Sequence, residues 1–219
     1  MYKHKVIPSW RPKKAVRRTP LMMKLSHARE FSLADVRRCL YDQTGRITMK
    51  ECRYIFRHAR LKTLAKNPLR TLRGYNDELE MCLRYGNKEA HYIEGVKQFF
   101  ALHDRPRGMR HLKFSAEKQY KKGNYLYAIL KMLAGDHVVG MNLLDLHKWR
   151  NNTYSVDKVW KQVKRTLHEV PIIKRRTYGT NMILIMPPRS CNLKDIKKRC
   201  TKCFYYKEME KFLELVYRG

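Results

Sequence analysis

The segment Asn87-Lys-Glu-Ala-His-Tyr-Ile-Glu-Gly95 recurs 33 residues later as Tyr120-Lys-Lys-Gly-Asn-Tyr-Leu-Tyr-Ala128. Both copies place a small residue, a Tyr and a second small residue at the same spacing. The segments Gly108–Leu112 and Gly140–Leu144 repeat in the same way, 32 residues apart, and both begin with Gly-Met. Small residues at fixed spacing let helices cross closely, and a period of about 33 residues is that of stacked helical hairpins.

This period predicts a tetratricopeptide-type array with helices over about 88–102, 107–119, 121–134 and 138–150. A further amphipathic helix is expected over about 155–168, before Pro171 ends it. Two repeats are too few to be stable alone, because at least about three stacked units are normally needed. The neighbouring helices are therefore expected to cover the open faces of the array, and the predicted fold class is all-α.

The chain divides into four predicted regions. Residues 1–20 form a basic, proline-punctuated tail that is expected to be disordered, and residues 21–73 form a helical head. Residues 74–152 form the repeats, and residues 153–219 form a small C-terminal helical segment that carries cysteines.

Within the head, apolar spacing predicts short helices from Leu21 to Leu25 and from Leu33 to Leu40. A third stretch runs from Met49 and is extended by Leu61 and Leu64 until Asn67-Pro68 breaks it. Ser32 with Asp35 and Thr48 with Glu51 have the spacing of helix N-caps. A fourth helix is expected over residues 75–85.

The C-terminal segment contains one apolar stretch of a different character. Met182-Ile-Leu-Ile-Met186 is short, partly β-branched and followed by Pro187-Pro188, which predicts either one strand or a buried extended segment. The stretches from Lys194 to Cys200 and from Tyr205 to Tyr217 are expected to be helical.

The charge balance is strongly basic, with 49 Lys and Arg against 19 Asp and Glu and a net charge of +30. Such a field attracts nucleic acid, anionic membrane surfaces and acidic proteins alike. One interpretation is therefore a basic helical protein that binds RNA or DNA. The residues that would contact phosphate in that case are Arg53, Arg57, Lys161, Lys164, Lys197 and Lys198.

No apolar run is long enough to span a bilayer, and the basic N-terminus lacks the order of a secretory signal. The sequence thus predicts a cytoplasmic or nuclear protein without a transmembrane segment. The six cysteines are then expected to be reduced thiols or metal ligands.

Cys191, Cys200 and Cys203 form the one cysteine cluster whose spacing is typical of a metal site. The Cys-x-x-Cys pair lets two thiolates reach one Zn²⁺ ion, and Cys191 could supply a third ligand. Two interpretations stay open, a zinc site and a set of unligated thiols. No Gly-rich phosphate loop, His-Glu-x-x-His motif or nucleophile elbow is present, so no enzymatic activity is predicted.

The run from Cys82 to Val96, followed by Gly108–Leu112, Ala116-Glu-Lys118 and Gly140–Leu144, resembles plant F-box proteins with SEL-like repeats. The Ser32–Val36 segment looks like the interior of an F-box, and the Cys200-x-x-Cys203 motif looks like the family's C-terminal cysteines. The F-box itself is degenerate, because Thr19–Lys24 has none of the acidic residues that usually follow its opening Leu-Pro pair.

This resemblance implies a protein-interaction module related to the substrate-recognition subunits of SCF ubiquitin ligases. The expected partners are a Skp-type adaptor and a client protein of unknown identity. Leu33, Val36 and Leu40 are the adaptor-facing candidates, although ordinary core packing is the alternative for each. The concave face of the repeats would bind the client, and the ligase chemistry would belong to the partners.

Overall fold

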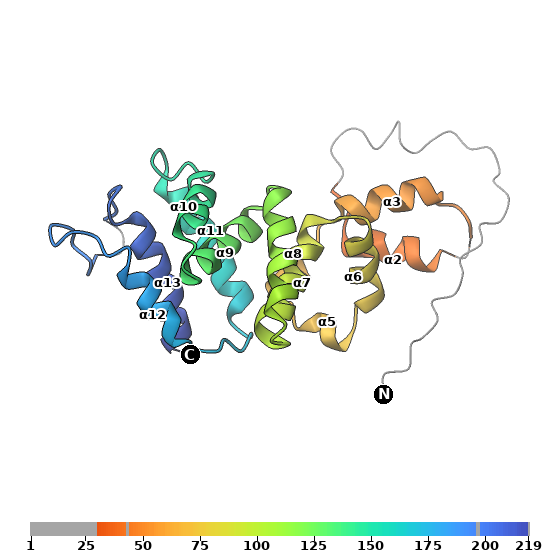
Figure 1. Cartoon of the computed structure of the whole chain (residues 1–219). Coiled ribbons are helices and arrows are strands. Elements are labelled where there is room, and N and C mark those ends of the chain that lie inside the picture. The colour runs from red at the N-terminus through yellow and green to blue at the C-terminus, as the bar shows by residue number, and fades with distance from the viewer. Residues whose placement is uncertain (1–29, 43, 196–197, 219) are drawn as a thin grey trace.

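The computed structural model describes residues 30–42, 44–195 and 198–218. Within these ranges the protein is an all-α repeat array without strands, and one isolated bridge pairs Ser32 with Arg60. The helices follow one another along the molecule, so that the head lies at one end and the C-terminal helices lie at the other (Figure 1). No helix in the described part of the chain is long and apolar enough to cross a membrane.

The array is built from short helices joined by tight turns. Their bounds are α2 Leu33–Tyr41, α3 Met49–His58, α4 Lys62–Lys66, α5 Arg70–Arg73, α6 Asn76–Arg84, α7 Lys88–Val96, the π-helical turn η1 Lys97–Ala101, α8 Arg105–Glu117, α9 Lys121–Leu133, α10 His137–Asp145, α11 Thr153–Leu167, α12 Arg176–Ile183 and α13 Phe204–Arg218. The repeat helices and the helix after them therefore begin close to the predicted positions, and their ends agree as well except that α10 ends at Asp145 rather than at residue 150.

Two equivalent glycines show why the sequence repeats. A side chain at Gly108 in α8 would place its Cβ 2.6 Å from the backbone nitrogen of Phe99 in η1. The matching Gly140 in α10 faces the backbone oxygen of Ala128 in α9, which a Cβ would approach to 2.7 Å. Each hairpin thus crosses with backbone against backbone, and any residue larger than glycine would force its two helices apart.

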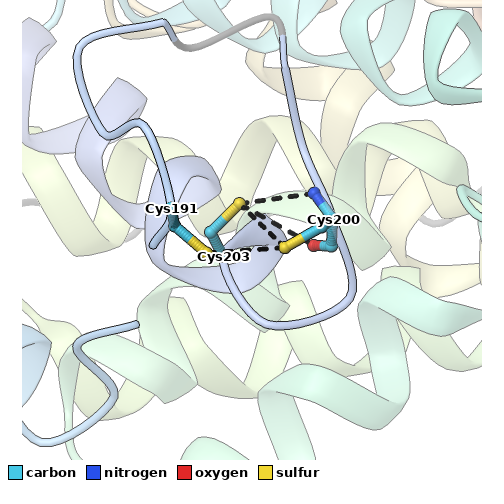
Figure 2. Close-up of side chains that lie close together, drawn as sticks. All are labelled: Cys191, Cys200 and Cys203. Carbon is cyan, nitrogen blue, oxygen red and sulfur yellow. Dashed lines mark hydrogen bonds between the residues drawn. The ribbon is translucent and has the colours of Figure 1, made fainter. Parts of the chain in front are cut away.

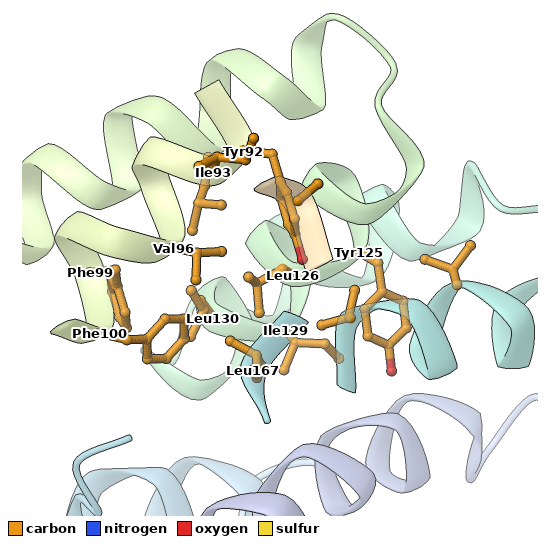
Figure 3. Close-up of a cluster of buried hydrophobic side chains, with 14 of the residues drawn as sticks. Tyr92, Ile93, Val96, Phe99, Phe100, Tyr125, Leu126, Ile129, Leu130 and Leu167 are labelled. Carbon is orange, nitrogen blue, oxygen red and sulfur yellow. The ribbon is translucent and has the colours of Figure 1, made fainter. Parts of the chain in front are cut away.

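The repeated tyrosines lie in the core between these hairpins. Tyr92 and Tyr125 occupy equivalent positions in α7 and α9, and both are completely buried. Figure 3 shows them among Val96, Ile129 and Leu167, which come from α7, α9 and α11. The apolar core is continuous from the head to α13, so the repeats are not packed separately from the rest.

Asn87 connects the head to the repeats. Its side-chain oxygen accepts hydrogen bonds from the backbone N–H groups of Glu89 and Ala90, which caps α7. Its amide nitrogen donates to the backbone oxygens of Phe56 and Ala59, at 2.9 Å each. One buried side chain therefore fixes the start of the first repeat helix against the end of α3.

Helix α11 covers another part of the array, as expected of a flanking helix. It packs on α9 and also reaches back to α4. The hydroxyl of Thr166 donates a hydrogen bond of 2.7 Å to the backbone oxygen of Ala65. The head and the C-terminal segment are thus joined across the repeats.

Three local predictions are wrong. Met182–Met186 is neither a strand nor a buried extended segment, because α12 continues to Ile183 and the side chains of Ile183, Leu184 and Met186 are exposed. Residues 194–195 and 198–200 are not helical. The stretch from Met49 is two helices, because Ala59 leaves the helical conformation and α4 begins at Lys62.

The N-cap pairs Ser32 with Asp35 and Thr48 with Glu51 both form capping boxes, as predicted. The predicted helix over Leu21–Leu25 and the predicted disorder of residues 1–20 lie outside the described residues. The division of the chain into four regions stays a prediction.

Candidate functional site

The adaptor-facing candidates lie on α2 in the head, but they are not equally accessible. Val36 is completely buried and belongs to the core, so it cannot contact a partner while this fold is intact. Leu33 and Leu40 are half-buried and pack against that core. The candidate set is thereby corrected to Leu33 and Leu40, beside the exposed Tyr41 at the end of the same helix.

A second set of exposed apolar side chains lies on and after α10 and α12, toward the opposite end of the molecule. Val138 and Leu146 on or directly after α10 are 70% and 69% exposed, and Leu184 after α12 is 70% exposed. The two helices are adjacent, since His137 Nε2 lies 2.9 Å from the backbone oxygen of Asn181. We call Val138, Val139, Leu146, Ile183, Leu184 and Met186 the apolar end surface.

The basic candidates do not converge on one site. Arg57 lines a surface hollow of about 370 Å³ between α3 and α7, whereas Lys161 and Lys164 line another, of about 350 Å³, on α11. Arg53 is exposed on α3, and Lys198 is exposed in the cysteine loop. Lys197 lies outside the described residues. Nucleic-acid binding therefore stays a prediction, and its affinity should fall steeply between low and moderate salt.

A buried charge network joins the repeats to α13, and no local sequence pattern predicts it. Arg199 donates hydrogen bonds to both carboxylate oxygens of Asp157, at 2.8 and 2.7 Å, and to Glu208 at 2.8 Å. Lys211 donates to Asp157 at 2.8 Å and to Glu208 at 2.6 Å. The hydroxyl of Tyr125 donates to the other oxygen of Glu208, at 2.7 Å.

This network is electrically balanced, with two cations and two carboxylates. Burial works against the ionised form of Asp157, but the hydrogen bonds from Arg199 and Lys211 outweigh it and lower its pKa to about 2. Burial and the neighbouring Glu208 carboxylate raise the pKa of Tyr125 well above its usual value. The tyrosine that marks the repeat thus also serves as a hydrogen-bond donor to the C-terminal helix.

The three cysteines of the C-terminal segment converge, as their spacing suggested. Figure 2 shows their sulfur atoms facing one another where the loop from Cys191 returns to α13. The Sγ of Cys200 lies 3.6 Å from that of Cys191 and 3.5 Å from that of Cys203. Among the described residues, these are the ones whose ligand atoms group closely enough to hold a metal ion.

The cysteine environment favours a thiolate at one position. The sulfur–sulfur contact with Cys203, with further hydrogen bonds from backbone N–H groups, lowers the pKa of Cys200 to about 7. Desolvation and the hydrogen bond with Cys200 raise the pKa of Cys191 to about 11. Cys39, Cys52 and Cys82 are buried elsewhere in the head and α6, away from this cluster.

Lys207 fixes the loop that carries the cysteines. Its side chain is completely buried, and its ammonium donates hydrogen bonds to the backbone oxygens of Asn192, Asp195 and Lys198 at 2.6, 2.8 and 2.6 Å. These contacts use all three protons of the ammonium. One side chain of α13 therefore holds the described parts of the loop, residues 192–195 and 198, and no local sequence pattern predicts this role of Lys207.

Residues 68–168 match the model of a family described as plant tetratricopeptide repeats. The matched segment runs from α5 to α11 and covers less than half of the chain. An F-box protein of Arabidopsis thaliana is 29% identical over 89 residues, which cover 41% of this chain and 54% of that protein. The alignment thus spans about half of the relative's length. No solved structure matches the chain. The predicted resemblance to plant F-box proteins with helical repeats is confirmed, and the chain is a protein-interaction module.

Two half-buried histidines in the repeat region are expected to make folding sensitive to acid. Burial lowers the pKa of His91 to about 4, with the facing His111 as a second cause, and burial likewise lowers the pKa of His147 to about 4. The unfolded chain then binds more protons than the folded chain between pH 6.5 and about 4, so stability decreases as the pH falls through that window. After discounting for partial exposure, we expect a loss of about 2 kcal/mol between pH 7 and pH 5.

The measurement is chemical denaturation at several pH values. The double variant His91→Phe/His147→Phe should make the profile shallower above pH 5, because the two histidines with the most strongly lowered pKa values are gone, although burial also lowers the pKa values of His58 and His111. An unchanged profile in that variant would show that other groups cause the acid sensitivity.

Proposed function

We propose that this chain is a substrate-recognition subunit of an SCF-type ubiquitin ligase, which holds a Skp-type adaptor at its head and a client protein at its repeats. The observation that carries the proposal is the apolar end surface on a repeat array of the plant tetratricopeptide type. Val138, Leu146 and Leu184 are about 70% exposed, and groups of exposed apolar side chains are typical of protein-binding surfaces.

The two surfaces suit a bridging role. Leu33, Leu40 and Tyr41 lie on α2 at one end of the molecule, whereas the apolar end surface lies on α10 and α12 toward the other end (Figure 1). A continuous core joins the two ends, so a client and an adaptor could bind at the same time in a fixed relative position. The similarity to an F-box protein favours a Skp-type adaptor as the partner of the head. The ligase chemistry would then reside in the partners, in the cytoplasm or nucleus.

A binding experiment with matched variants tests this role. Purified Skp-type adaptor is immobilised and offered the full chain, the variant Leu33→Arg and the variant Leu184→Arg at near-physiological salt. We expect the full chain and Leu184→Arg to be retained and Leu33→Arg to bind at least about tenfold more weakly, because a charge replaces an apolar contact. Circular dichroism establishes that each variant is folded. Equal retention of both variants, or loss of both, would contradict docking through α2.

A further inference from the structure

The spacing of the three cysteine sulfurs supports an inference that does not depend on the proposed function. Three sulfur atoms from Cys191, Cys200 and Cys203 lie within 4.8 Å of one another on a loop that the fold holds in place. A tetrahedral site with Zn–S distances of about 2.3 Å needs sulfurs about 3.8 Å apart. The separations of 3.6 and 3.5 Å from Cys200 Sγ are close to that value.

The arrangement is less suited to a disulfide. A disulfide bond would join two of the sulfurs and leave the third cysteine as a free thiol, whereas one metal ion would bind all three. A group of sulfur ligands with tetrahedral spacing selects zinc over calcium, magnesium or manganese, which prefer oxygen.

The loop is also fixed independently of any metal. Lys207 binds three of its carbonyl groups, as described above, and Arg199, directly before Cys200, is anchored to Asp157 and Glu208. The backbone N–H of Cys200 donates to the Cys203 sulfur at 3.3 Å, which fixes the two cysteines relative to each other. The protein therefore organises the sulfurs before a ligand arrives.

The charge around the cluster fits a thiolate-bound metal. The hydrogen-bond acceptors of the Lys207 ammonium are neutral carbonyl groups, and the Glu210 carboxylate also interacts with it electrostatically. One of them, the Lys198 oxygen, also lies 4.0 Å from Cys203 Sγ, so the ammonium is close to the sulfurs. Three thiolates and one Zn²⁺ ion carry a net charge of −1, which this buried cation would balance.

We propose that Cys191, Cys200 and Cys203 bind one Zn²⁺ ion through their sulfur atoms, with a water molecule as the fourth ligand. Water can reach the site because Cys200 is exposed and Cys191 is half-exposed. Binding forms three Zn–S bonds, the protons of the remaining thiols leave to solvent, and no electron is transferred. The ion ties the loop to the start of α13 and stabilises that end of the fold.

Metal analysis of the full chain tests this site. The protein is purified without chelator, incubated with zinc, separated from free metal and analysed by mass spectrometry for metal content. We expect about one zinc ion per chain, and less than about half an ion in Cys191→Ser and in Cys200→Ser. The control Cys39→Ala removes a buried thiol outside the cluster and should keep its zinc.

Cobalt substitution gives a second readout that does not depend on stability. The Co²⁺-loaded full chain should show a thiolate charge-transfer band and the visible bands of a tetrahedral site, and both should be lost in Cys200→Ser. A zinc content below half an ion in the folded wild type would overturn the proposal. So would full zinc content in the serine variants, or an intact mass lower by about two hydrogens that reveals a disulfide.

Discussion

Replacing Gly108 with Ala is expected to lower the free energy of unfolding by about 3 kcal/mol, although it adds one methyl group. The new Cβ would lie 2.6 Å from the backbone nitrogen of Phe99 and 2.7 Å from its Cα. Backbone atoms cannot rotate away as a side chain can, so α8 and η1 must separate. Because one core extends from Phe31 to Val216, the loss should appear as earlier unfolding of the whole protein.

The matched control is Gly179→Ala in α12, where nothing lies within 4 Å of the added Cβ. Alanine is the better helix former, so this variant should be unchanged or more stable by up to about 1 kcal/mol. Urea denaturation followed by circular dichroism measures both variants. Two separate transitions in Gly108→Ala would contradict a single cooperative core, and equal effects of the two substitutions would contradict the packing argument.

Bulky residues at Ala90 or Gly95 should also unfold the whole protein.

Replacing Glu208 with Gln is expected to cost about 3–5 kcal/mol, because it removes one partner of a buried ion network. Glu208 accepts hydrogen bonds from Arg199, Lys211 and Tyr125 and is completely buried. The amide has nearly the same shape, so the change mainly removes charge. Two buried cations would then share the single carboxylate of Asp157.

An exposed ion pair provides the comparison. Glu117 lies 3.8 Å from Lys113 on α8, and both side chains are about 60% exposed. Glu117→Gln should change the free energy of unfolding by less than about 1 kcal/mol. Both variants replace a glutamate with a glutamine. The difference between their free energies of unfolding, obtained by thermal denaturation, therefore compares the buried network with the exposed ion pair. Similar values for both would show that the network contributes little to stability.

The repeat region could be predicted from the sequence because its signals are local. The equivalent Gly108 and Gly140, the paired Tyr92 and Tyr125, and the turn residues between them fix helix crossings within about 30 residues of one another. The caps at Ser32 and Thr48 depend on a neighbour three residues away and were likewise correct.

The errors come from contacts between distant parts of the chain. Met182–Met186 has the composition of a strand, but no described strand is available to pair with it, and its first two residues end α12 instead. Val36 is spaced like its neighbours on α2, and only the packing of the head shows that it is buried.

The candidate sites likewise combine local features that the sequence predicts with contacts between distant residues that it does not. The clustering of the cysteines could be anticipated from their spacing, whereas the loop that positions them depends on Lys207. Nothing in the sequence distinguishes this lysine, or Arg199 and Lys211, from the many basic residues on the surface. Buried charges of this kind are recognised only when their partners from other helices are in place.

The most direct test of the account is the mass of the complex that the full chain forms with a purified Skp-type adaptor, measured by light scattering during gel filtration at near-physiological salt. If the chain binds the adaptor, we expect a single species whose mass equals one adaptor plus one 26.4 kDa chain. A folded, monomeric chain that elutes separately from the adaptor would contradict it.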